Sequence, residues 1–114
     1  MRVECNSVAD FLVNLDGQAR RVFGGKVWVE KKVNVEGSDP RMVIKQRVIV
    51  QVGAVLREDD GSEYLLIAGE DCGVDYMDGG GEDKGSKIAE ALLLNVKTFC
   101  DANGLTVRPG KVSE

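Results

Sequence analysis

The chain has 114 residues, of which 43% are hydrophobic and 30% charged, a formal net charge of -4 and no histidine. This length predicts a single domain over 1–114, and the composition is too apolar for a disordered chain. The absence of histidine excludes Ser-His-Asp and Cys-His catalysis as well as histidine-based metal sites.

The first predicted element is a short helix over 7–15, where apolar side chains recur at helical spacing and Asn6 or Ser7 can cap the first turn. Two strands follow over 26–35 and 42–56, because apolar and polar residues alternate there with a period of two. Each strand therefore has one apolar face.

The pairing of these two strands follows from their apolar faces. The apolar residues are odd-numbered in the first strand and even-numbered in the second. If both apolar faces lie on the same side of the sheet, an odd-numbered residue must pair with an even-numbered one, so the numbers of opposed residues sum to an odd value. A sum of 77 puts Val29 opposite Val48 and Glu30 opposite Arg47, and it leaves 37–40 as the connection.

A second hairpin leads to a third strand over 63–69. Asp60 and Gly61 are typical of a two-residue turn, because glycine adopts positive φ without a steric penalty. With these two residues at the corner, we expect Leu56 to face Leu65.

The C-terminal part is predicted to contain a loop, a helix and a strand. Residues 70–85 are rich in glycine and acids and have no periodic pattern, so we expect a long mobile loop. An amphipathic helix follows over 87–101 with Ser86 as its N-cap, and a short strand covers 105–108.

This order of elements predicts the α+β class, with an antiparallel meander and both helices packed on one face. That face would carry Val48, Val50 and Ile67. The opposite face has Trp28 and Leu66 among its charges, and we expect either a homodimer or a covering segment to shield this apolar patch.

Charge is concentrated in one segment. Residues 57–87 carry three basic and ten acidic side chains, a net of 3 - 10 = -7. Such a segment repels phosphate and attracts basic protein surfaces, so we expect a protein partner and no nucleic acid. The candidate partner-binding residues are Asp71, Asp75, Tyr76, Met77, Asp78, Glu82, Asp83 and, on the sheet, Trp28.

No metal site, cofactor or catalytic residue is predicted. The spacing of Asp71, Asp75 and Asp78 offers hard oxygen ligands but matches no EF-hand. The order Lys84-Gly85-Ser86 departs from the phosphate-binding G-K-[ST] pattern. The three cysteines contain no C-x-x-C pair, which predicts reduced thiols.

The leading hypothesis is therefore a small acidic, non-enzymatic interaction protein that binds a basic partner. It would act as an inhibitor, adaptor or immunity-like factor of bacterial or phage type. No apolar run reaches the roughly 18 to 20 residues of a membrane span, and the N-terminus lacks the apolar core of a signal peptide. We expect a cytoplasmic protein with no membrane partner.

The alternative hypothesis is enzymatic. The predicted order of elements resembles the core of the PD-(D/E)xK nuclease superfamily, with Glu30 and Lys32 supplying the letters E-x-K. The resemblance implies a metal-dependent nuclease or phosphoesterase in which Asp16 and Glu30 hold Mg²⁺ and Lys32 aids the attacking water. A third hypothesis, ranked last, is single-stranded nucleic acid stacked on the sheet face near Trp28 and Arg47.

Overall fold

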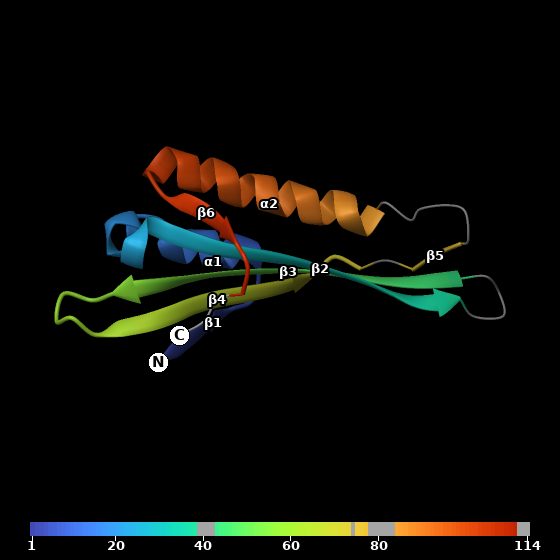
Figure 1. The fold of residues 1–114 in the computed structure, drawn as a ribbon, viewed down its shortest axis with the longest axis horizontal. Coiled ribbons are helices and arrows are strands. Elements are labelled where there is room, and N and C mark those ends of the chain that lie inside the picture. The colour runs from blue at the N-terminus through green and yellow to red at the C-terminus, as the bar shows by residue number, and fades with distance from the viewer. Residues whose placement is uncertain (39–42, 74, 78–83, 112–114) are drawn as a thin grey trace.

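The structure is a computed structural model that describes residues 1–38, 43–73, 75–77 and 84–111 (Figure 1). The elements in chain order are β1 (Arg2–Cys5), α1 (Val8–Leu15), the short 3₁₀ turns η1 (Ala19–Arg21) and η2 (Phe23–Gly25), β2 (Lys26–Ser38), β3 (Val43–Arg57), β4 (Glu63–Asp71), β5 (Asp75–Met77), α2 (Lys84–Asn103) and β6 (Thr106–Pro109). Two helices and one sheet confirm the α+β class.

The described strands form one mixed sheet in the order β1-β4-β3-β2-β6, with β5 pairing part of β3. The predicted antiparallel meander is correct for β2, β3 and β4 and wrong at both edges. There β1 runs parallel to β4, and β6 runs parallel to β2. The four residues of β1 are too few to show a periodic pattern, which is why the sequence did not predict this strand.

Both helices lie on the same side of the sheet (Figure 1). They cover the even-numbered face of β3, whose side chains are fully buried. These β3 residues are Val48, Val50, Val52, Ala54 and Leu56. From the helices, Phe11 and Val96 are also fully buried, whereas Phe99 is only partly buried. The predicted N-cap Ser7 accepts a hydrogen bond from the Asp10 N–H at 3.1 Å.

The register between β2 and β3 differs from the predicted one by four residues. Val29 lies opposite Val52 and Val33 opposite Val48, so opposed numbers sum to 81 instead of 77. The apolar faces still coincide, because an even shift leaves every side chain on the same face. The predicted pair of Glu30 with Arg47 is therefore wrong, and Glu30 faces Gln51.

The turn between β3 and β4 is one residue longer than predicted. The Glu58 N–H donates to the Ser62 carbonyl at 2.8 Å, and the Gly61 N–H donates to the Glu58 carbonyl at 3.0 Å. Gly61 has φ +88°, which is the left-handed residue of a three-residue hairpin loop. The extra residue pairs Leu56 with Tyr64 in place of Leu65.

This one-residue change exchanges the two faces of β4. Leu66 belongs to the helix-covered core at 2% exposure, and Ile67 lies on the outer face instead of the core. Both placements correct the prediction. The predicted long loop is also wrong over part of 70–85, because β4 extends to Asp71, β5 pairs with β3, and α2 begins at Lys84.

We expect Phe11→Ala to lower the free energy of unfolding by about 3 to 5 kcal/mol, because it removes a fully buried ring from between α1 and the sheet. The matched control is Val13→Ala on the same helix, whose side chain is 72% exposed. Urea unfolding should show a change within about 0.5 kcal/mol for the control. Equal losses in the two variants would contradict this packing of α1.

Candidate functional site

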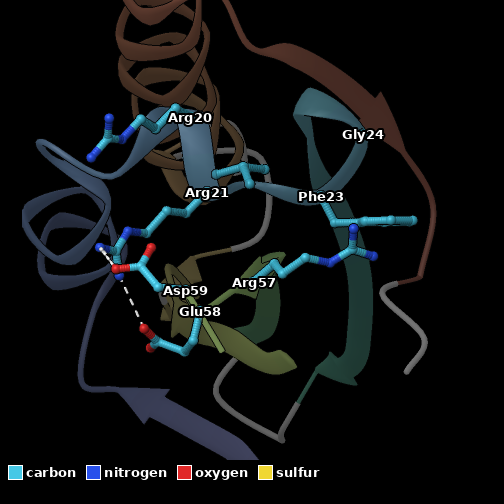
Figure 2. Close-up of a pocket in the computed structure, with 8 residues that line it drawn as sticks. Arg20, Arg21, Phe23, Gly24, Arg57, Glu58 and Asp59 are labelled. Carbon is cyan, nitrogen blue, oxygen red and sulfur yellow. Dashed lines mark hydrogen bonds and ion pairs between the residues drawn. The ribbon is translucent and has the colours of Figure 1, made fainter. Parts of the chain in front are cut away.

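A hollow of about 460 Å³ opens at one end of the sheet, where the α1–β2 connection meets the β3–β4 turn (Figure 2). We call it the sheet-end hollow. Its lining residues are Arg20, Arg21, Val22, Phe23, Gly24, Arg57, Glu58 and Asp59. Cationic and aromatic side chains thus share one concave surface with two carboxylates.

The backbone around Phe23 explains why an aromatic ring faces solvent. Val22 is buried at 5% exposure and forms a bridge to Leu56, which anchors the connection to β3. Gly24 and Gly25 then adopt φ +66° and +65°, the left-handed region that glycine tolerates best. The chain reverses directly after Phe23, whose side chain remains 54% exposed.

Arg57 is fixed beside that ring. Its guanidinium carbon lies 4.7 Å from the centroid of the Phe23 ring, within the range of a cation–π contact. Its Nη2 atom also lies 3.0 Å from Glu63 Oε1 across the hairpin. Arg57 is therefore oriented by a carboxylate on one side and an aromatic face on the other.

The other two arginines differ in their partners. Arg21 contacts Glu58 Oε2 at 3.0 Å and Asp59 Oδ2 at 3.4 Å, so two carboxylates neutralise it. Arg20 is exposed and forms no hydrogen bond or ion pair with any described residue. Figure 2 shows Arg20 and Arg21 on one side of the hollow and Phe23 with Arg57 on the other. Arg20 is thus available to an incoming carboxylate.

The predicted acidic site lies at the other end of the sheet. Asp71 ends β4, forms an ion pair with Arg47, and accepts the Gly73 N–H at 2.8 Å. The Gly73 hydrogen bond and then Arg47 hold the pKa of the Asp71 carboxyl below its ordinary value. One predicted binding carboxylate is therefore already engaged within the chain.

The remaining predicted acidic-site residues are described only in part. Asp75, Tyr76 and Met77 form β5, and their backbone pairs with 43–45 of β3. Their side chains lie outside the described residues. Asp78, Glu82 and Asp83 also lie outside them. The structure thus brings Asp71 of β4 and the strand β5 to the same edge of β3, where Asp75 is opposite Lys45.

Trp28 lies on the outer face of the sheet, opposite Gly53 and next to Arg108. It is partly covered by the end of the chain. The Gly110 N–H donates to the Val29 carbonyl at 3.0 Å, and a Cβ placed on Gly110 would lie 3.8 Å from the indole ring. The C-terminal segment therefore supplies a covering segment over this part of the apolar patch.

The structure separates the residues of the nuclease hypothesis. Glu30 lines a depression of about 150 Å³ on the outer face, and its Oε1 atom lies 3.5 Å from Lys32 Nζ. Asp16 instead follows α1, which covers the opposite face (Figure 1). Asp16, at the end of α1, and Glu30, on the outer face of β2, thus come from different sides of the sheet.

The pKa values of all three cysteine thiols are raised, and burial is the main cause. Cys72 is a core residue at 5% exposure, and burial, then Glu70 and Asp71, raise its pKa. Burial and Asp101 raise the pKa of Cys100, and burial and Asp10 raise that of Cys5. A raised pKa keeps each thiol protonated at neutral pH and lowers its reactivity as a nucleophile.

No protein-family model, curated protein or solved structure matches this chain. Within the described residues, neither helix is long and apolar enough to span a membrane. The same part of the chain contains no group of three or more cysteine, aspartate or glutamate side chains arranged to hold a metal ion.

The sheet-end hollow was not predicted from the sequence. One local signal was present, since Phe23 is followed by two glycines and preceded by Arg20 and Arg21. The two glycines favour a sharp turn directly after the ring, because glycine adopts positive φ without a steric penalty. The contribution of Arg57 could not be found in this way, because it comes from a hairpin more than thirty residues later in the chain.

Asp71→Asn should lower stability at neutral pH, because it removes the charge that Arg47 and the Gly73 N–H stabilise. A carboxylate whose pKa is lowered in the folded state stabilises the protein at any pH above the ordinary carboxyl pKa. This stabilisation is lost as the pH falls through the lowered pKa. The difference in unfolding free energy between parent and variant should therefore shrink as the pH falls below the ordinary aspartate pKa, and it should vanish once the pH lies below the lowered pKa of Asp71. Urea titrations at several pH values measure it, and a difference that grows on acidification would contradict the assignment.

Proposed function

We propose that this chain is a small non-enzymatic interaction protein that binds a protein partner, with the sheet-end hollow as its principal contact surface. The observation that carries this proposal is the exposed Phe23 ring with Arg57 fixed against it at 4.7 Å. Aromatic and arginine side chains in concave surfaces supply a large share of the binding energy of protein interfaces. This pair is therefore suited to anchor a partner.

Preorganisation favours this role. The Glu63 ion pair and the Phe23 ring restrict Arg57, while the bridge between Val22 and Leu56 fixes the backbone beside the ring. Side chains that are already ordered lose less conformational entropy when a partner binds. The surface fits a partner that places an apolar side chain on Phe23 and a carboxylate near Arg20.

The acidic segment is a second contact in this proposal. The molecule measures 58 Å along its longest axis, and β5 lies near the opposite end from the β3–β4 turn (Figure 1). Asp71 is engaged by Arg47, which leaves Asp75, Asp78, Glu82 and Asp83 as the candidates for a basic surface. A partner would thus contact the arginine-rich end and the acidic end through separate regions.

The nuclease hypothesis receives no support from this geometry. Its mechanism needs two carboxylates around one metal ion. Asp16 and Glu30 come from different sides of the sheet, and Lys32 contacts Glu30 as an ion pair. An interaction protein is therefore the better proposal.

Phe23→Ala tests the hollow. A protein partner captured by cross-linking to the parent is identified and titrated against each variant by calorimetry. We expect about thirtyfold weaker binding, which corresponds to an interface residue contributing about 2 kcal/mol. Val13→Ala is the control, because it truncates another exposed apolar side chain that does not line the hollow. Unchanged affinity in Phe23→Ala would show that the hollow is not the contact.

Replacing Asp75, Asp78, Glu82 and Asp83 by Asn or Gln tests the acidic segment. The association rate with the same partner should fall, and its dependence on salt should weaken, because charge steers the encounter over a Debye length of about 8 Å. Stopped-flow mixing at two salt concentrations measures both effects. If the variant associates as fast as the parent, the acidic segment does not contact the partner.

A further inference from the structure

Among the described residues, one edge of β2 has no partner strand beyond Val29. β2 covers Lys26–Ser38 and pairs with β3 along one side. On its other side β6 pairs only with Lys26–Val29. In the described part of the chain no strand continues this pairing beyond Val29, and residues 31–34 are all exposed. A strand edge of this kind can accept a further strand.

The backbone groups on this edge can be assigned from the hydrogen bonds. The Gly110 N–H donates to the Val29 carbonyl, so the backbone N–H and C=O groups of Val29 point toward the edge at which β6 pairs. Successive residues of a strand point their N–H and C=O groups to alternate sides. Lys31 and Val33 therefore direct their backbone groups to the open edge, while Lys32 directs its groups to β3.

The C-terminal segment turns away from this edge. Gly110 has φ +127°, and Lys111 lines the outer-face depression together with Arg2 and Ile67. These last two residues belong to β1 and β4, on the far side of β3 from β2. The described end of the chain thus crosses the sheet instead of extending along β2.

We propose that the open edge of β2 binds an extended, acidic segment of a partner protein by strand addition. Main-chain hydrogen bonds to Lys31 and Val33 would supply affinity, and side chains at alternate positions would supply specificity. The proposal rests on the edge alone and is independent of the sheet-end hollow.

Charge and apolar exposure define the incoming segment. Lys31 forms no ion pair with a described residue. Lys32 forms a long ion pair with Glu30, with 3.5 Å between Lys32 Nζ and Glu30 Oε1. Val33 is 50% exposed and lies on the same face of β2 as Lys31, whereas Lys32 lies on the opposite face. Val33 would accept an apolar neighbour. Opposite charges on adjacent strands favour pairing, and like charges oppose it. An acidic strand therefore fits better than a second copy, which would bring another Lys31 and Lys32 to the same edge.

The probe is an acetylated and amidated peptide of alternating valine and glutamate, titrated into ¹⁵N-labelled protein. We expect changes in the amide chemical shifts of Lys31 and Val33 and slower hydrogen exchange at both amides. Val33→Pro removes the edge N–H and leaves the hydrogen bonds to β3 in place, so the peptide should bind about tenfold more weakly. Val33→Thr is the matched control, because it keeps both the N–H and a β-branched side chain.

A second variant keeps the test decisive if Val33→Pro does not fold. The double variant Lys31→Glu, Lys32→Glu retains the backbone and should prefer a valine–lysine peptide over the valine–glutamate peptide. Phe23→Ala should leave peptide binding unchanged, which separates this proposal from the hollow. The proposal is wrong if neither amide responds, if Val33→Pro binds like Val33→Thr, or if sedimentation shows that a second copy occupies the edge.

Discussion

The buried face of β3 is the constraint on which the structure depends. Five alternate residues from Val48 to Leu56 are fully excluded from solvent, and both helices cover them. Burial of this stripe fixes β3 at the centre of the sheet and requires its neighbours to present their own apolar faces on the same side. The pairing of β2 and β4 with β3 follows from that requirement.

The two ends of the same strand leave this core in different ways. Leu56 is buried, and the next residue, Arg57, extends into the sheet-end hollow. At the other end β3 pairs with β2 and with the short β5. The strand that organises the core therefore also sets the separation between the arginine-rich end and the acidic end of the molecule.

Charge pairing depends on this arrangement and not on sequence proximity. Arg47 pairs with Asp71 of the neighbouring strand β4, although the sequence suggested Glu30 of β2 as its partner. Exposed ion pairs contribute little energy compared with the burial of an apolar strand face. They follow the register that apolar packing selects, and for this reason charge complementarity alone predicted the wrong partner.

The sequence by itself determined the two helices, the strands β2, β3, β4 and β6, and the faces of the first two predicted strands, but not the short strands β1 and β5. Apolar alternation with a period of two distinguishes one face from the other but permits any even shift, so the β2–β3 register required tertiary packing. The extra residue in the turn at Gly61, which placed Leu66 in the core, required the actual backbone conformation. The hollow was decided only by tertiary structure, because Phe23 and Arg57 meet through a long-range contact that no local pattern records.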